Sequence, residues 1–192
     1  AKGGTLYVTL EPCCHAGRTG PCTEAILKSG IREVVVGMKD PNPLNSGKGI
    51  RTLRSSGIRV RVGVLKNACR RLIAPFIKYM TKKLPYVTVK VAQSLDGKIA
   101  TASGASHWIT GEVARRLVHA ERANTDAIVV GVNTVLKDDP LLTARQAGKP
   151  LLYQPTRIVL DRYLRTPRDS RLVRTSFQAP LFLAIGKDVS EK

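Results

Sequence analysis

Short apolar runs alternate with amphipathic stretches along the first half of the chain. Apolar and β-branched residues predict strands where the runs are short and bounded by Gly, Pro or Asn, and a 3.6-residue period predicts helices. The elements expected in order are a strand at 5–10, a helix start at 21–27, a strand at 33–37, a helix around 50–55, a strand at 58–64 and a long helix near 66–82. This alternation predicts a layered α/β sheet with parallel pairings.

The second half repeats the alternation after Leu84-Pro85, where the residue before proline is disfavoured in a helix and a domain boundary is expected. The expected elements are a strand at 86–92, a turn at 94–98, a helix at 111–123 capped by Thr110, a buried strand at 127–130 closed by Gly131, and strands at 157–160 and 181–184. The sequence therefore predicts two α/β domains, 1–83 and 84–192.

Composition places the chain among globular proteins and outside two other classes. With 43% hydrophobic and 24% charged residues it has enough apolar side chains for a core. No apolar run approaches the ~20 residues that cross a bilayer, so no membrane partner is expected. The chain opens directly into a strand-like run and stops just after another, and we expect both ends to be cut from a longer protein.

The formal charge of +18 raises nucleic-acid binding as an alternative. Such proteins usually gather Lys and Arg into a stripe with interleaved aromatic residues. Here the basic residues are scattered and aromatic residues are only 5% of the chain. A basic site also suits a phosphorylated small molecule. We therefore expect a small-molecule partner and no nucleic acid.

Three of the four cysteines fall in one loop, at Cys13, Cys14 and Cys22, while Cys69 stands alone and is expected to pack as a small apolar side chain. Adjacent thiols near a third one suit metal ligation better than a disulfide framework and indicate a reducing cytoplasm. Cys22 begins a predicted helix, whose partial positive charge favours a thiolate. The alternative is a loop in which the cysteines only pack.

The segment Glu11–Cys22 resembles the zinc loop of the cytidine-deaminase-like superfamily, which carries Pro-Cys-x-x-Cys. In this chain the gap between Cys13 and Cys22 is longer and contains His-x-Gly-Arg-Thr. Such a gap is similar to that of the bifunctional deaminase–reductase family of riboflavin biosynthesis. The resemblance implies that Cys13 and Cys22 are zinc ligands and Cys14 a neighbour. Further substrate contacts implied are His15, Arg18 and, in the turn Asp40-Pro41-Asn42-Pro43, Asn42.

The family's histidine ligand and glutamate proton shuttle form a His-x-Glu on a helix before the first strand. No such motif stands before Cys13. The catalytic residues are therefore left unassigned, and we expect that helix upstream of Ala1 and a Gly-rich cofactor segment downstream of Lys192.

The second half has no Gly-x-Gly-x-x-Gly fingerprint, which argues against a Rossmann domain. The blocks 87–100, 106–110 and 131–143 resemble the riboflavin-pathway reductases, which share the dihydrofolate-reductase-like fold. Taken singly, Trp108 would more often be a core residue and an arginine a surface one. The resemblance implies cofactor contacts at Ala92, Trp108, Thr134 and Asp138, and substrate contacts at Ser106, Arg122, Leu142 and Arg145.

The predicted fold is thus the C-terminal part of a cytidine-deaminase-like α/β domain followed by the N-terminal part of a dihydrofolate-reductase-like α/β domain. The resemblance implies zinc-dependent deamination of a diaminopyrimidinone ribosylamino phosphate, then NADPH-dependent reduction of the ribosyl group to ribityl. Zn²⁺ and NADPH are the expected cofactors, and a cytoplasmic homo-oligomer is expected. The alternatives are a zinc-stabilised nucleic-acid-binding module and a deaminase acting on tRNA or nucleosides.

Overall fold

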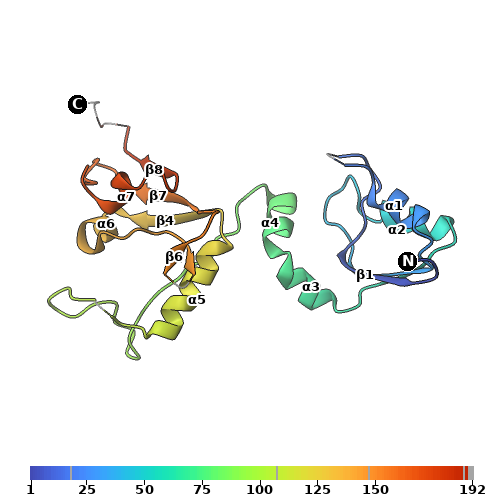
Figure 1. Cartoon of the computed structure of the whole chain (residues 1–192), viewed down its shortest axis with the longest axis horizontal. Helices are drawn as coiled ribbons and strands as arrows, with labels where there is room; N and C mark the ends of the chain where they lie inside the picture. Colours follow the sequence, from blue (N-terminus) through green and yellow to red (C-terminus); the bar gives the residue numbers. More distant parts are fainter. Residues whose placement is uncertain (18, 107, 147, 188, 190–192) are drawn as a thin grey trace. The chain divides into compact units, whose positions relative to one another are not determined.

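The computed structural model describes residues 1–17, 19–106, 108–146, 148–187 and 189. They form two compact units, Ala1–Val89 and Lys90–Lys192 (Figure 1). The predicted boundary at Leu84-Pro85 lies a few residues before this division. Each unit combines helices with a parallel sheet, so the predicted α/β class is confirmed.

The first unit is built on a parallel sheet of three strands in the order β1-β2-β3. Right-handed crossovers through helices connect strands of this kind because parallel neighbours cannot be joined by a tight turn. The elements in chain order are β1 (Thr5–Leu10), α1 (Cys22–Lys28), β2 (Glu33–Met38), α2 (Lys48–Ser55), β3 (Arg59–Val62), α3 (Lys66–Leu72) and α4 (Ala74–Lys82).

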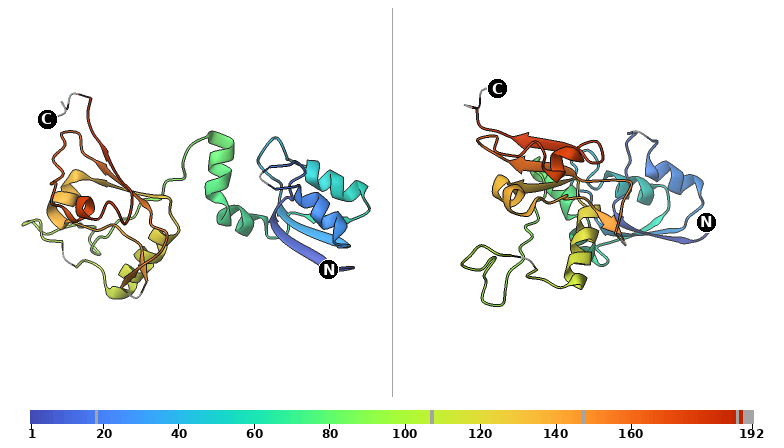
Figure 2. Two further views of the ribbon diagram at one scale, coloured as in Figure 1. Left: turned by 45° about the horizontal axis from the view of Figure 1, so that its top comes forward. Right: turned by 60° about the vertical axis from the view of Figure 1, so that its left-hand side comes forward.

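The core of the first unit lies between this sheet and the helices α1 and α2, which lie side by side (Figure 2). Val34 and Val36 of β2 are fully buried there with Leu53 of α2. Side chains alternate across a strand, so the intervening positions face the other side of the sheet. On that side Cys69 of α3 packs where a side chain on Gly37 would otherwise stand, which explains the glycine.

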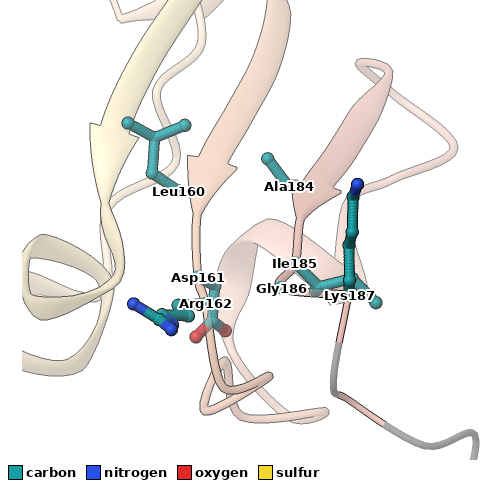
Figure 3. A pocket seen from close by; sticks show the side chains of 7 residues that line it. All are labelled: Leu160, Asp161, Arg162, Ala184, Ile185, Gly186 and Lys187. Carbon is teal, nitrogen blue, oxygen red and sulfur yellow. The ribbon is translucent and has the colours of Figure 1, made fainter.

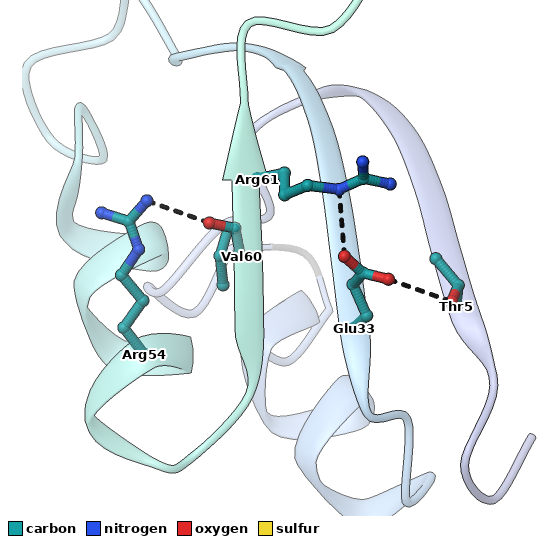
Figure 4. A network of polar contacts seen from close by, with 5 residues as sticks. All are labelled: Thr5, Glu33, Arg54, Val60 and Arg61. Atoms are coloured by element: carbon teal, nitrogen blue, oxygen red, sulfur yellow. Dashed lines mark hydrogen bonds and ion pairs between the residues drawn. The ribbon is translucent and has the colours of Figure 1, made fainter.

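Polar pairs tie the three strands together at their amino ends (Figure 4). Glu33 of β2 accepts from Arg61 of β3 at 3.0 Å and from the Thr5 hydroxyl of β1 at 3.5 Å. Arg54 of α2 donates to the Val60 carbonyl at 3.0 Å. The Glu33–Arg61 pair is partly exposed, so it contributes little to stability.

The second unit contains a parallel sheet in the order β4-β7-β8 and a separate two-stranded antiparallel pair, β5-β6. Val159 of β7 is fully buried, and Val135 of α6 and Leu172 of α7 pack in the same core. The elements are α5 (Glu112–Ala123), β4 (Ala127–Gly131), α6 (Val132–Asp138), β5 (Arg145–Gln146), β6 (Lys149–Pro150), β7 (Thr156–Leu160), α7 (Arg171–Arg174) and β8 (Leu181–Ala184).

A buried arginine runs through this second core. Arg157 of β7 is 0% exposed and donates to the carbonyls of Leu141, Thr175 and Ala179 and to the Thr175 hydroxyl, at 2.5–3.2 Å. Burial lowers its pKa from the ordinary value. A buried cation is tolerated only where hydrogen bonds replace its hydration. Arg157 therefore cross-links the segments before β5 and around α7.

The helices of the first unit depart from the prediction at one place. The helix expected over 66–82 is two helices, α3 and α4, which meet at Ile73 (φ −108°, ψ 24°). Pro75 stands in the first turn of α4, where its missing N–H costs nothing, whereas inside a continuous helix it would remove a hydrogen bond. Among the described helices none is long and apolar enough to span a membrane.

Three further expectations in the second half are wrong. Residues 86–92 form no strand, because no neighbouring strand pairs with them in the described chain. The cap of α5 is Gly111 rather than Thr110, whose carbonyl instead accepts from Arg115 at 2.8 Å. The strand β4 is not buried on both faces, since its residues alternate between exposed and half-buried.

Candidate functional site

In each unit some polar or glycine residues stand at or just after the carboxyl ends of parallel strands. In the first unit Glu11 follows β1 and Asp40 comes shortly after β2. In the second Gly131 ends β4 and Asp161 follows β7. Ligands in open α/β sheets bind outside this edge, because the loops that leave it converge there.

Glu11 organises the loops at the edge of the first sheet. Its carboxylate is 3% exposed and accepts three backbone N–H groups, from Asp40 at 3.1 Å, Gly47 at 2.8 Å and Ile50 at 3.2 Å. Gly47 has φ 79°, a left-handed conformation that favours glycine. Glu11 thus fastens the end of β1 to the 40s loop and to the start of α2.

Asn45 completes the contact between the two loops. It is fully buried, its Oδ1 accepts from the Cys14 N–H at 3.0 Å, and its Nδ2 donates to Asp40 Oδ2 at 3.1 Å and to the Pro12 carbonyl at 3.4 Å. At Gly49 an added Cβ would run into the Pro12 carbonyl oxygen, so only glycine permits this approach. We call Glu11, Asp40 and Asn45 the loop clamp.

The sequence reasoning missed the loop clamp as a functional element. In the sequence Asp40 stands within a turn, and Glu11 only begins the segment that resembles the zinc loop. The sequence signal for Glu11 is its position between an apolar strand and a proline. Acidic residues are usually exposed to solvent, so this position indicates a buried carboxylate with hydrogen-bond partners.

The loop clamp holds Cys13 beside the first turn of α1. The Cys22 N–H donates to Cys13 Sγ at 3.2 Å, and the Thr23 N–H donates to the Cys13 carbonyl at 3.1 Å. A hydrogen bond with Cys13, then burial, then the Cys13 charge raise the pKa of the Cys22 thiol. Two thiols this close disfavour joint ionisation unless a cation lies between them, which is the electrostatic setting of a metal dithiolate.

These two thiols fit a zinc ion as part of its ligand set. A hydrolytic zinc takes three protein ligands and keeps one position for water. Within the described ranges no group of three His, Cys, Asp or Glu residues comes together. Cys13 and Cys22 would therefore supply two of the zinc ligands, and the described residues bring no third ligand to them. Cys14 is held through its backbone N–H and is half-buried, with a free thiol.

The remaining predicted residues of this unit lie in different surroundings. His15 is exposed, and Arg18 lies outside the described residues. Asn42 is half-buried and closes a turn, because its N–H donates to Asp40 Oδ1 at 2.8 Å and its Oδ1 accepts from the Leu44 N–H at 3.1 Å. Substrate contact by these three residues stays a prediction.

We expect Glu11→Gln to loosen the loop clamp. Glutamine keeps one acceptor oxygen and turns an amide toward donors that now lack a partner, at about 1–3 kcal/mol. Amide hydrogen exchange of Gly47 and Ile50 in the full-length protein should accelerate by about one to two decades. Glu24→Gln is the control, because Glu24 is exposed on α1 and only pairs with Lys28 at 3.9 Å. Equal exchange in both variants would contradict the role given to Glu11.

In the second unit one cavity joins a predicted substrate residue to a predicted cofactor residue. Ser106 and Asp138 come from segments far apart in sequence, and both face a cavity of about 330 Å³. The lining residues are Ser103, Gly104, Ala105, Ser106, Lys137 and Asp138. Thr134 lies one turn before Asp138 on α6, and helix residues four apart share a face.

Trp108 and Ala92 do not line that cavity in the described chain. Trp108 is 71% exposed, and the Arg115 guanidinium lies 4.5 Å from its ring centroid. This cation–π contact orients the indole beside the start of α5. Ala92 is half-buried in the irregular segment before the turn at 94–98. The structure thus groups one of the four predicted cofactor residues, Asp138, with Ser106.

The segment that carries Leu142 and Arg145 is held at the carbonyls of Leu141, Thr143 and Ala144. Leu142 is 5% exposed with φ 52°, and its side chain packs in the core, so only its backbone is open to a ligand. Gln154 brackets Ala144, accepting from its N–H at 2.8 Å and donating to its carbonyl at 2.9 Å. With Arg157 on the Leu141 carbonyl, Gln154 is a positioning residue that sequence reasoning did not single out.

Arg122 of α5 meets this segment from the other side. Its Nη1 donates to the Thr143 carbonyl at 3.3 Å, and burial, then the Arg145 charge, lower its pKa from the ordinary value. Arg145 Nε is buried and has no partner among the described residues. No described carboxylate forms an ion pair with Arg122 or Arg145. Two cations held together without an acid have the composition of an anion site.

A second cavity, of about 530 Å³, opens at the carboxyl ends of β7 and β8 (Figure 3). Burial of Asp161 opposes its charge, but hydrogen bonds from the Arg165 and Thr166 N–H groups and the Thr166 hydroxyl prevail and lower the pKa of Asp161. Arg162 stacks 5.5 Å from the Tyr163 ring centroid. The lining residues are Leu160, Asp161, Arg162, Ala184, Ile185, Gly186 and Lys187.

Comparison with known proteins gives matches in both units. Residues 85–192 match the family described as the RibD C-terminal domain, and residues 1–38 match the cytidine and deoxycytidylate deaminase zinc-binding region. The riboflavin biosynthesis protein RibD of Aquifex aeolicus is 52% identical over 192 residues, which are 100% of this chain and 53% of that protein. The chain spans about half the length of the curated relatives it matches.

Solved structures resemble the chain over its whole length. A diaminohydroxyphosphoribosylaminopyrimidine deaminase/5-amino-6-(5-phosphoribosylamino)uracil reductase from Thermotoga maritima superimposes with a TM-score of 0.86 at 42% identity, covering 100% of this chain and 53% of that one. One crystal form of Acinetobacter baumannii RibD gives a TM-score of 0.83 at 39% identity, covering 100% of this chain and 57% of that one.

Proposed function

The chain belongs to the family of the RibD C-terminal domain, and we propose that the full-length protein is a bifunctional deaminase and reductase of riboflavin biosynthesis. The observation that carries the proposal is the match of the two units to two different catalytic domains of one type of relative. The first unit would belong to the zinc deaminase and the second to the NADPH reductase.

In the deaminase the residues of this chain would hold the metal and the substrate. Cys13 and Cys22 would be two of three protein ligands, kept in place by the loop clamp. Zinc, when bound, supplies Lewis-acid activation of the water that replaces the amino group of the pyrimidinone, with release of ammonia. His15, Arg18 and Asn42 would contact the phosphorylated substrate.

In the reductase the cation pair Arg122 and Arg145 would take the substrate phosphate, because a fork of guanidinium donors matches its oxygens. Ser106 and Asp138 would place the ribosyl group and the cofactor against each other across their shared cavity. NADPH, when bound, supplies the hydride that reduces C1′ and opens the sugar to ribityl. Ala92, Trp108 and Thr134 would complete the cofactor contacts.

The unpaired thiols support a reducing compartment. Cys13, Cys14, Cys22 and Cys69 are all free in the described structure. We accordingly propose a cytoplasmic protein, and we retain homo-oligomerisation as part of the proposal, which light scattering on the full-length protein would measure.

Removal of zinc separates the two activities. A full-length protein treated with a strong chelator should lose ammonia release from the diaminopyrimidinone phosphate by about a hundredfold or more, because the water is no longer activated. NADPH oxidation with substrate that is already deaminated should stay within about twofold, since the two proposed zinc ligands of this chain, Cys13 and Cys22, both belong to the first unit.

Two outcomes would contradict the proposed function. Unchanged deamination after verified loss of the metal would contradict a zinc-dependent mechanism. Salt-dependent binding of random-sequence RNA or DNA, without NADPH oxidation, would favour a zinc-stabilised nucleic-acid-binding module, to which the charge of +18 would then belong.

A further inference from the structure

One half-buried titratable group beside the Arg122–Arg145 pair has no role so far. His119 lies on α5 three residues before Arg122, and residues at that spacing share a helix face. Its Nδ1 is buried and, among the described residues, has no hydrogen-bond partner. A buried polar atom left without a partner costs free energy that a bound ligand can recover.

The surroundings of His119 are positive and lack a compensating acid. The helix α5 packs on β5, which carries Arg145, and Arg145 Nε is likewise buried without a partner in the described chain. The charged groups that act on the imidazole are Arg122 from its own helix and Arg145 from β5. The two unpartnered nitrogens therefore belong to elements that pack against each other, and Arg122 and Arg145 both act on the imidazole.

We propose that His119 is a third phosphate-binding residue of the Arg122–Arg145 site and that binding of a phosphate ester is coupled to uptake of a proton by its imidazole. The proposal rests on the proposed function, in which this pair takes the substrate phosphate. A neutral imidazole offers one N–H donor, whereas the protonated ring offers two and adds a charge. A phosphate dianion would supply the negative charge and the hydrogen-bond acceptors that the cluster lacks.

The direction of the proton transfer follows from the charges. Burial first, then Arg122 and Arg145, lower the pKa of His119 below its ordinary value, against a smaller opposing contact with the Thr143 backbone. The imidazole is therefore neutral near pH 7 in the free protein. A phosphate dianion next to it raises this pKa, so the bound form gains a proton. The stabilisation of the complex is present at lower pH and is lost as pH rises through the raised, bound-state pKa.

The test uses ribose 5-phosphate as the probe and the full-length protein. Calorimetry at pH 7.5 in buffers of different ionisation enthalpy counts the protons taken up, at a pH where the ester is mostly a dianion. Wild type should take up a substantial fraction of a proton. His119→Gln should take up close to none and bind about tenfold more weakly, as expected for one lost hydrogen bond to a charged group. The weakening should shrink toward pH 9.

Controls separate this proposal from the function on which it rests. Arg116→Gln removes a positive charge from an exposed position of the same helix, paired with Glu112 at 3.2 Å, and should match wild type in affinity and proton uptake. If Arg122→Ala weakens binding but His119→Gln does not, His119 has no part and the phosphate site stands. If His119→Gln weakens binding with unchanged proton uptake, the proton coupling is wrong. If Arg122→Ala binds like wild type, the phosphate site itself is wrong.

Discussion

Replacing Cys22 by serine in the full-length protein is expected to abolish stoichiometric zinc and deamination, and Cys13→Ser should do the same. Serine is a poor zinc ligand because its hydroxyl stays protonated near neutral pH. The apparent binding free energy of a structural zinc site, shared among its four ligands, is about 2.5–4 kcal/mol per ligand, so zinc affinity should fall by about two to three decades. Metal content after dialysis and ammonia release are the two measurements.

Cys14→Ser is the matched control for these variants. Cys14 lies in the same loop and is held through its backbone N–H by Asn45, so its thiol is dispensable for the fold of the loop. It should keep zinc and most of the activity. Full metal content in both Cys13→Ser and Cys22→Ser, with loss in Cys14→Ser, would overturn the ligand assignment.

Arg122→Ala and Arg145→Ala should each lower the reductase kcat/KM for the phosphorylated substrate by about one to two decades, because a hydrogen bond to a charged group contributes about 1.5–3 kcal/mol. The loss should appear mainly in KM, since the phosphate is remote from the reduced carbon. Deamination by the same protein should stay near normal, because both arginines lie in the second unit.

Arg116→Ala tests whether a general loss of positive charge explains such an effect. Arg116 lies on α5 like Arg122, but it is exposed and pairs with Glu112. Its removal should change either activity by less than about twofold. Equal damage to deamination and reduction in Arg122→Ala would instead indicate unfolding, which circular dichroism of the variant would reveal.

Local pattern sufficed for most elements of the fold. The apolar runs at β1, β2 and β7 were predicted almost to their observed ends, because a short β-branched run bounded by turn residues has few alternative structures. The run at 86–92 has the same composition but pairs with nothing in the described chain. A strand needs a neighbour, which composition cannot supply.

Single residues show the same division at the ends of helices. Pro75 was visible in the sequence, but the periodicity around it favoured one long helix over 66–82, whereas the ring steric conflict separates α3 from α4 at Ile73. Gly111 rather than Thr110 stands at the N-cap of α5, and no side chain caps this helix. Boundaries depend on such local geometry more than on pattern.

The amino-acid sequence alone predicted the α/β class and the two families that the halves resemble. It also identified the thiols and arginines worth testing, because all of these depend on apolar runs, spacings and residue types. Folding added the partners. Glu11 reaches N–H groups as far away as Ile50, and Gln154 and Arg157 hold the segment that presents Arg145. The role proposed for His119 depends on its closeness to Arg145, which lies on another element and lowers the pKa of the imidazole. Such hydrogen bonds join positions from 10 to 39 residues apart, and they arise because buried polar groups must find partners wherever packing brings them together.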